Sequence, residues 1–327
     1  MTDQTMSGAP VNEKTRQPLR VPVLHMGIFA ALLIFFLAAP FFLYPVFLMK
    51  VLCFALFACA FNLLLGYGGL LSFGHAAFFG GASYISAHAA KMWGFTPELA
   101  VLLGTGAAAV LGLVIGSLAI RRQGIYFAMV TLAFAQMVFF FSLQAPFTGG
   151  EDGIQAVPRN LLFGLFDIRH DRAFYFFVLA ICFGGVLLIY RIIHSPFGQV
   201  LKAIRENEQR SISLGYQVNR YKLAVFVISA TLAGTAGATK ALVFQLASLT
   251  DVHWTMSGEV VLMALLGGIH TIFGPIAGAA LIVAMQNYFA GFGAWVTVLQ
   301  GAIFVIAVLL FREGIVGVIG KWLKKPL

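Results

Sequence analysis

The stretch LAVLLGTGAAAVLGLVIGSLAI, residues 99–120, has no charged side chain along its whole length. A helix needs about 20 mostly apolar residues to cross the hydrocarbon core of a bilayer, which is about 30 Å thick. Because backbone amides inside lipid must find partners within the protein, unbroken apolar runs favour helices over the alternating strands of a membrane barrel. The stretch therefore predicts a membrane-spanning helix.

Similar apolar runs recur along the chain. Of the 327 residues, 60% are hydrophobic and 10% are charged, whereas about 25% are charged in an ordinary soluble domain. The runs predict spans at about residues 23–43, 46–65, 74–90, 99–120, 125–143, 173–191 and 222–244. The sequence thus predicts an all-α integral membrane protein and excludes a soluble domain.

The last apolar stretch, residues 260–311, is shorter than the about 60 residues that three full helices would need. Glycines divide it into three pieces, at Gly267 and Gly268 and again at Gly291 and Gly293. Three crossings place both basic ends of the chain on one side of the membrane. We therefore expect about ten transmembrane helices with Gly-interrupted segments.

Positive charge marks the topology of the chain. The formal net charge is +9, and most basic residues gather at the two ends and in two loops. Because basic loops remain in the cytoplasm, this pattern indicates topology and not nucleic-acid binding. We expect a cytoplasmic tail at residues 1–22, a transmembrane domain at 23–311 with an external loop at 144–172 and a cytoplasmic loop at 195–221, and a cytoplasmic tail at 312–327.

Cysteine and histidine give no sign of a metal or catalytic site. The three cysteines, Cys53, Cys59 and Cys182, lie in apolar runs and are interpreted as buried free thiols. The seven histidines are scattered without ligand or catalytic spacing. We expect no catalytic residues, no metal site and no cofactor in this chain.

Two glycine-rich breaks in the apolar runs resemble each other. They read GGLLSFG at residues 68–74 and GGIHTIFG at residues 267–274, and they match with a one-residue offset. Transporters often contain paired breaks of this kind, whose unwound backbone near the midplane contacts the solute. Glycine is also common in membrane helices because it lets them pack closely. An internal repeat and a chance match both remain open.

Polar groups inside predicted spans supply the candidates for a solute path. Such groups are costly in lipid and suggest function by default, although many only form hydrogen bonds to neighbouring helices. The candidates flank the two breaks: Asn62, Gly69, Ser72, His75, Gly267 and Gly268. Lys240 and Glu259 lie near the predicted outer ends of their helices. Snorkelling or a mutual ion pair explains them better than capture of a zwitterion.

The cytoplasmic loop contains a short amphipathic helix between Pro196, which can open a helix, and Gly215, which can end one. Such a helix either lies on lipid or docks into a partner protein. Glu206 and Glu208 are interleaved with Arg205 and Arg210, whereas a lipid-binding helix is dominated by Lys and Arg. The mixed charge favours docking to a protein.

This loop, with NRYKLAVFVISA at residues 219–230, resembles the LivM-type permeases of branched-chain amino acid ABC importers. Three further stretches agree, namely NLLLGYGG with SFGHAAFFG at residues 62–80, GIYFAMVTLA at 124–133, and GG with GPIAGA at 267–279. The resemblance covers about residues 46–311 in the order that the family shows. It implies a permease subunit, in the bacterial inner membrane, that imports branched-chain or related amino acids.

The resemblance also implies partners. These are a second related permease, two cytoplasmic ATPases and an external solute-binding protein. The coupling helix received by an ATPase would contain Arg205, Glu206, Asn207, Glu208 and Gly215. The chain has no phosphate-binding loop motif, so it is not expected to be an enzyme, and ATP and magnesium would bind to the partner ATPases. Replacing Glu206 and Glu208 by Lys is predicted to abolish solute-stimulated ATP hydrolysis.

Other functions are alternatives to this interpretation. Relatives for urea and short amides belong to the same family, and the sequence does not exclude them. A secondary transporter driven by an ion gradient would need membrane carboxylates, and few are present. A membrane enzyme would need clustered His or carboxylates, and a receptor would not explain the glycine breaks.

Overall fold

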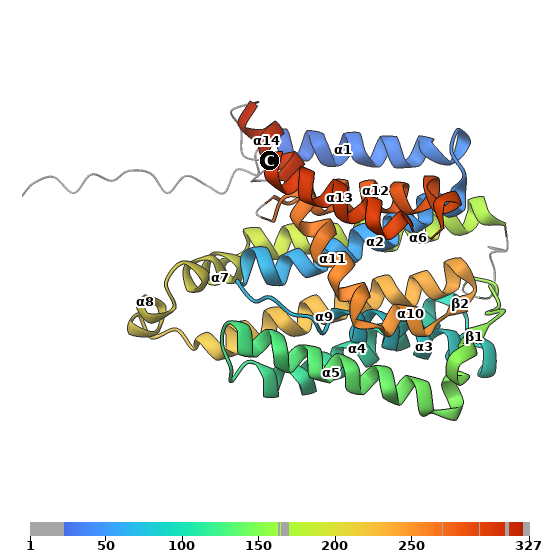
Figure 1. Cartoon of the computed structure of the whole chain (residues 1–327), viewed down its shortest axis with the longest axis horizontal. Coiled ribbons are helices and arrows are strands. Elements are labelled where there is room, and N and C mark those ends of the chain that lie inside the picture. The colour runs from blue at the N-terminus through green and yellow to red at the C-terminus, as the bar shows by residue number, and fades with distance from the viewer. Residues whose placement is uncertain are drawn as a thin grey trace, which may run out of the picture.

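The computed structural model of the chain describes residues 23–162, 164, 170–269, 271–293, 295–310 and 314–322. The expected tail at residues 1–22 lies outside this part, as do His270 and residues 165–169 of the expected external loop. Most of the described chain is helical, and the helices run roughly side by side (Figure 1).

The first half of the chain forms six helices that follow the predicted spans. They are α1 (Val23–Ala38), α2 (Pro45–Asn62) with a π-helical continuation η2 (Leu63–Tyr67), α3 (His75–Met92), α4 (Pro97–Ala119), α5 (Ile125–Gln144) and α6 (Asp171–His194). Short 3-10 turns follow α1 (Ala39–Phe41) and α5 (Pro146–Thr148 and Gly150–Asp152).

The second half contains the loop helices and the remaining apolar helices. They are α7 (Pro196–Glu206), α8 (Glu208–Ser213), α9 (Val218–Phe244), α10 (Leu249–Val252), α11 (Trp254–Gly267), α12 (Gly274–Tyr288), a 3-10 turn (Ala290–Phe292), α13 (Trp295–Leu310) and α14 (Gly314–Trp322). The three pieces expected between residues 260 and 311 are thus present as α11, α12 and α13.

One feature departs from an all-α fold. Strand β1 (Ile154–Gln155) pairs antiparallel with β2 (Leu246–Ala247), so that Ile154 lies opposite Ala247. The pair ties the segment after α5 to the end of α9. Two-residue strands carry too little alternation to be found in a sequence.

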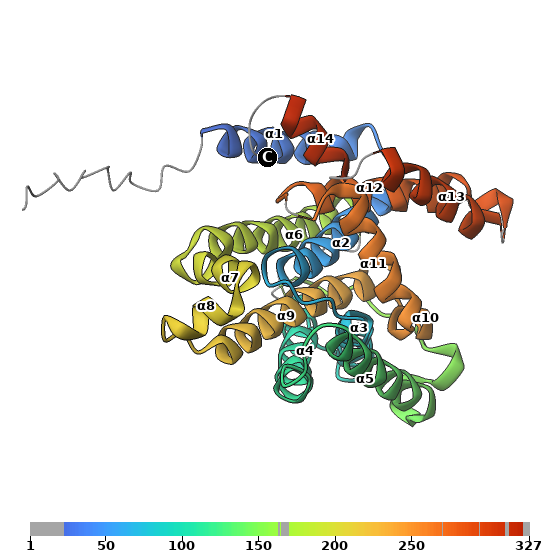
Figure 2. The ribbon, with the colours of Figure 1, turned by 60° about the vertical axis from the view of Figure 1, so that its left-hand side comes forward.

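Helix α2 lies in the middle of the molecule, where it contacts α6, α9, α11 and α12. Helices α1 and α13 lie on one side of it, and α4 and α5 lie on the other (Figures 1 and 2). In an 18-residue window of its span, Pro45–Tyr67, 89% of the residues are buried. An apolar helix that is buried all round is typical of the centre of a membrane bundle.

Small residues let α3, α4 and α9 approach closely. A Cβ atom on Gly237 would collide with the carbonyl oxygen of Phe79, and one on Gly104 would lie 2.9 Å from the Cβ of Ala238. Without a hydrophobic driving force between helices in lipid, such close backbone contact is a main source of association. These glycines therefore serve packing.

Five helices are long and apolar enough to cross a membrane, within the described residues: Pro45–Tyr67, Pro97–Ala119, Ile125–Gln144, Asp171–His194 and Val218–Phe244. Each matches a predicted span. The other apolar helices, α1, α3, α11, α12 and α13, have 14 to 18 residues, short of the about 20 that a full crossing needs. The count of ten crossings stays a prediction.

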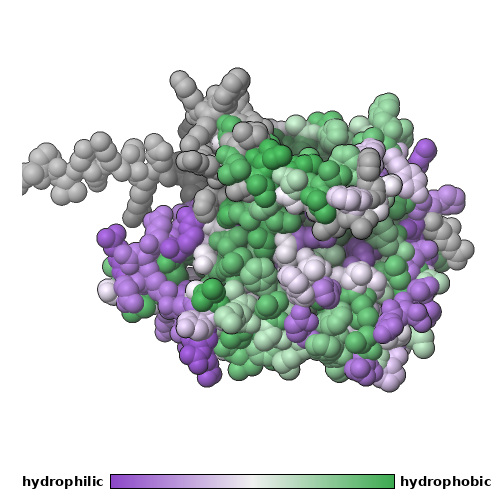
Figure 3. All heavy atoms as spheres, viewed as in Figure 1, coloured by the Kyte–Doolittle hydropathy of each residue, from purple (hydrophilic) through white to green (hydrophobic). Residues whose placement is uncertain are grey.

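The surface supports residence in a membrane. Figure 3 shows an apolar band between two hydrophilic ends. One end is formed by α7 and α8, and α1 also begins there; it is called the α7–α8 end (Figure 1). The opposite end carries the two strands and is called the β1–β2 end.

Residues 314–322, in the expected C-terminal tail, form α14, whose Gly314 lies directly against the backbone of Gly268.

Candidate functional site

The loop at residues 195–221 contains two helices, where one was expected between Pro196 and Gly215. Ser195 caps α7 by accepting a hydrogen bond from the amide of Gly198 at 3.3 Å. Asn207 then has extended backbone, and its Oδ1 accepts from the amide of Arg210 at 2.9 Å. Asn207 is therefore the N-cap of α8, and this cap explains why one helix ends and a second one begins at this residue.

The two acidic residues of this loop have different surroundings. The Oε2 of Glu208 pairs with the Nζ of Lys222 on α9 at 2.8 Å, and its Oε1 accepts from the Nε2 of Gln123 at 3.1 Å. Glu206 is exposed. Glu208 thus holds α8 to the rest of the protein, whereas Glu206 faces solvent.

Apolar side chains are exposed at the end of this loop. Ile212 is 50% and Leu214 is 70% exposed, and Tyr216 is also exposed. Gly215 has a φ of +85°, a conformation that favours glycine and turns the chain here. Together with Glu206 these side chains form a protruding surface of mixed charge and apolar groups, which is called the docking surface.

Two separate cavities of this fold differ in chemistry: one is polar and the other is mostly apolar. The polar one, about 240 Å³, lies beside α7 and α8. Its walls include Gly69, Arg205, Glu208 and Lys222. This cavity therefore lies between the loop helices and the first break.

The first break, residues 68–74, joins η2 to α3 without helical structure. Gly69 has a φ of +69°, which favours glycine. The break ends in a hydroxyl cap, because the amide of Gly74 donates to the Oγ of Ser72 at 3.1 Å. The amide of Phe73 donates to the Oγ1 of Thr131 on α5 at 3.2 Å.

The second break, residues 268–273, shares two features with the first, although its hydroxyl lies three residues and not two before the capped glycine. Gly268 has a φ of +120°, and the amide of Gly274 donates to the Oγ1 of Thr271 at 3.0 Å. In both breaks the second glycine of the pair has a positive φ, and a hydroxyl caps the glycine that follows. This correspondence favours an internal repeat over a chance match.

The end of the α2–η2 helix, just before the first break, contacts the second break. The Nδ2 of Asn62 donates to the carbonyl of Thr271 at 3.0 Å. A Cβ on Gly66 would collide with the carbonyl oxygen of Ile269. Asn62 was a candidate for the solute path, and here it ties the end of α2 to the second break.

Ser72 and His75 are fully buried. His75 Nε2 lies 2.8 Å from the Oγ of Ser229, which in turn donates to the carbonyl of Ala60 at 2.6 Å. These bonds tie α3 to α9 and α2. Of the six path candidates, Gly69 borders the polar cavity, and Gly267 and Gly268 lie tightly against neighbouring backbone.

The outer-end charges do not pair as expected. Lys240 forms an ion pair with Asp251 at 2.6 Å, and both side chains are buried. Glu259 instead accepts a hydrogen bond from the Nε2 of Gln286 at 3.1 Å. The expectation of a mutual Lys240–Glu259 pair was therefore wrong, because the short helix α10 brings Asp251 to Lys240.

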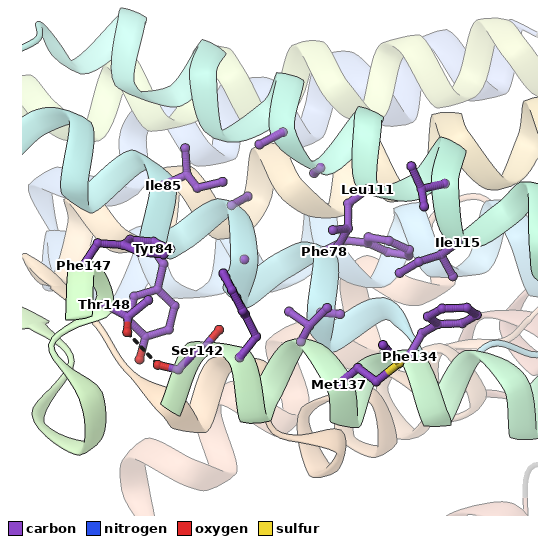
Figure 4. A pocket seen from close by; sticks show the side chains of 18 residues that line it. Phe78, Tyr84, Ile85, Leu111, Ile115, Phe134, Met137, Ser142, Phe147 and Thr148 are labelled. Carbon is purple, nitrogen blue, oxygen red and sulfur yellow. Dashed lines mark hydrogen bonds between the residues drawn. The ribbon is translucent and has the colours of Figure 1, made fainter. Parts of the chain in front are cut away.

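The larger cavity, about 400 Å³, lies among α3, α4 and α5. Figure 4 shows its mostly apolar side chains, with Tyr84, Ser142 and Thr148 together at one end. Thr148 donates to the carbonyl of Ser142 at 2.6 Å. The charged ends of an amino acid would find few partners in this cavity.

Several contact residues were missed at the sequence level. They are Gln123, Arg159, Lys222 and Asp251. Each acts through a partner distant in sequence or on another helix, which no local pattern encodes. Asp251 carried one usable signal, since Ser248 three residues earlier begins a capping box.

The family model for the permease component of branched-chain amino acid transport systems matches residues 44–308. The chain belongs to this family. The match extends from the start of α2 into α13, and it includes both breaks and the loop with α7 and α8.

Individual relatives agree with the family. The chain is 27% identical to the high-affinity branched-chain amino acid transport system permease protein LivM of Salmonella typhimurium, over 78% of this chain and 65% of that protein. The same figures hold for LivM of Escherichia coli. A probable LivM of Methanocaldococcus jannaschii is 31% identical over 52% of this chain and 49% of that protein. The chain thus spans 65% of the length of the two bacterial relatives. No solved structure matches it.

Proposed function

We propose that this permease is one of two permease subunits of an ABC importer that carries branched-chain amino acids into the cytoplasm. The observation that carries the proposal is the docking surface, which belongs to the α7–α8 end (Figure 1), and this end is hydrophilic and lies beyond the apolar band (Figure 3). Family membership supplies the substrate class. The related LivM proteins are named for branched-chain amino acid transport.

The proposal includes the topology and the partners. The α7–α8 end faces the cytoplasm, and both tails lie there, in the inner membrane of a bacterium. An ATPase receives the docking surface, and the ATPases bind ATP and magnesium. A second permease completes the membrane part, and an external solute-binding protein delivers the amino acid at the β1–β2 end.

In this arrangement, the docking surface couples ATP to transport. ATP binding changes the separation of the ATPases, and a transporter can use that change only through contacts that differ between its two conformations. The exposed Glu206, Ile212 and Leu214 offer such contacts. Their mixed chemistry suits a protein groove better than a lipid surface.

The test is uptake by proteoliposomes. The permease is reconstituted with the second permease, the ATPases and the binding protein encoded beside it, and uptake of radiolabelled leucine is measured. We expect uptake that requires ATP and competes with isoleucine and valine. Competition by urea or acetamide, with none by valine, would overturn the substrate. Uptake driven by an ion gradient without ATP would overturn the ABC importer.

A further inference from the structure

Two cations of helix α7 contact the end of the span formed by α2 and η2, Pro45–Tyr67. The Nη1 of Arg205 donates a hydrogen bond to the carbonyl of Gly66. The Nζ of Lys202 lies 5.6 Å from the ring centroid of Tyr67. Gly66 and Tyr67 are the last two residues of η2. Residues three apart on a helix share a face, so one face of α7 presents both cations to this helix end.

These contacts satisfy a physical need of the helix end. The last carbonyls of a helix have no intrahelical partner, and the helix dipole concentrates negative charge there. A basic side chain that binds these carbonyls stabilises the end. Partial burial, and then the positive charge of Arg205, lower the pKa of Lys202. Both observations place the two cations close to the end of η2.

The same arginine reaches the first break. A Cβ atom on Gly69 would lie 2.9 Å from the Cγ of Arg205, so the side chain of Arg205 fills the space above this glycine. Gly66 in turn lies against the backbone of Ile269 in the second break. Contacts therefore continue from α7 through η2 to both breaks.

Helix α8 is attached elsewhere. Glu208 binds Lys222 on α9 and Gln123 in the loop before α5. The two loop helices thus have separate anchors: α7 holds the first break, and α8 holds α9 and the α4–α5 loop. A force applied to the docking surface at Glu206, the last residue of α7, has a distinct route to the breaks, which passes through Arg205.

We propose that Arg205 is the positioning residue that transmits movement of α7 to the two glycine breaks, and that it is not an ATPase-docking residue. The proposal rests on the proposed function, since the movement of α7 comes from the ATPases. It divides the loop into two parts. The docking surface binds the ATPase, and Arg205 contacts the transport domain.

The test compares Arg205→Ala, Arg205→Lys and Arg122→Ala in the reconstituted transporter. Arg122 is exposed in the α4–α5 loop, and its side chain has no hydrogen bond or ion pair with the described residues, so it is a matched control. The readouts are ATPase co-purification and the number of ATP molecules hydrolysed per leucine taken up. Loss of a positioning role raises the ratio and leaves co-purification unchanged, whereas general loss of folding lowers co-purification, ATP hydrolysis and leucine uptake together.

We expect Arg205→Ala to retain the ATPases and to raise the ATP-to-leucine ratio about tenfold, the factor that one charge-assisted hydrogen bond is worth. Arg205→Lys keeps the charge without the forked donor, so it should raise the ratio less. Arg122→Ala should leave the ratio unchanged.

An unchanged ratio in Arg205→Ala would overturn the proposal, and so would loss of ATPase co-purification from correctly folded protein. If Arg205→Ala does not fold, the Arg205→Lys ratio decides, and a ratio equal to that of the unaltered protein overturns the proposal. Failure of the proposed function is separate, because the unaltered protein would then show no ATP-dependent uptake.

Discussion

Two arginines bind helix ends at opposite ends of the bundle, and their surroundings differ. Arg159, at the β1–β2 end, donates to the carbonyls of Leu242 and Val243 at 3.1 and 2.6 Å. These two residues directly precede Phe244, the last residue of α9. Its side chain is 9% exposed and pairs with Asp171 at 2.6 Å. Arg205, at the α7–α8 end, is exposed and belongs to a helix that protrudes from the bundle.

The comparison separates anchoring from transmission. At the β1–β2 end, both Arg159 and Lys240 are buried cations that pair with a carboxylate of the chain. Lys222 pairs with Glu208 in the same way at the α7–α8 end. What differs at this end is Arg205, which is exposed, binds the carbonyl of Gly66 and lies over Gly69 in the first break. We interpret the first end as a fixed frame and the second as the place where energy enters.

The largest expected effect is at the buried ion pair. Lys240→Met leaves Asp251 charged and buried without its partner, which should lower the free energy of unfolding by about 3 kcal/mol. The double variant Lys240→Met/Asp251→Asn removes both charges and keeps a capping side chain, so it should recover much of the loss. Thermal unfolding in detergent measures both. A double variant no more stable than the single one would contradict this account.

A smaller effect is expected at Arg159. Arg159→Ala removes hydrogen bonds to two carbonyls and the pair with Asp171, at a cost of about 2 kcal/mol in unfolding free energy. Because this end is a frame, the ATP-to-leucine ratio of assembled protein should not change, in contrast to Arg205→Ala. A raised ratio in Arg159→Ala would remove the distinction between the two ends.

Gly69 and Gly94 form a matched pair with nearly equal φ, +69° and +66°. An Ala at either position carries a backbone strain of about 1 kcal/mol. At Gly94 nothing lies within 4 Å of the new Cβ, whereas at Gly69 it meets Arg205. Gly69→Ala should therefore reduce uptake and Gly94→Ala should not. Equal uptake by the two variants would show that the contact with Arg205 has no role.

The smallest stability effects separate the two glutamates. Glu208→Gln removes one charge from the partly buried pair with Lys222 but keeps an acceptor oxygen, so it should lower the free energy of unfolding by only about 0.5 kcal/mol. Glu206→Gln should leave stability unchanged, and Glu206→Lys should weaken ATPase binding. This sharpens the earlier expectation that both glutamates act alike. ATPase binding lost in Glu208→Gln but kept in Glu206→Lys would reverse the assignment.

The sequence predicted what depends on local pattern. The charge-free runs located the long spans, the glycine pairs located both breaks, and the loop after Pro196 was recognised by its charge pattern and its family resemblance. It did not predict that Glu208 turns inward to Lys222, or that Asp251 reaches Lys240. Those contacts depend on how separate helices lie against one another, and helical periodicity within one segment does not encode that.

The most direct test of the central claim is photo-crosslinking of the assembled transporter. A photoreactive amino acid is placed at position 206 on the docking surface or at position 151 at the β1–β2 end, both of which are exposed. The account predicts an adduct with the ATPase from position 206 and none from position 151. An ATPase adduct from position 151, or from neither position in a transporter that hydrolyses ATP, would contradict it.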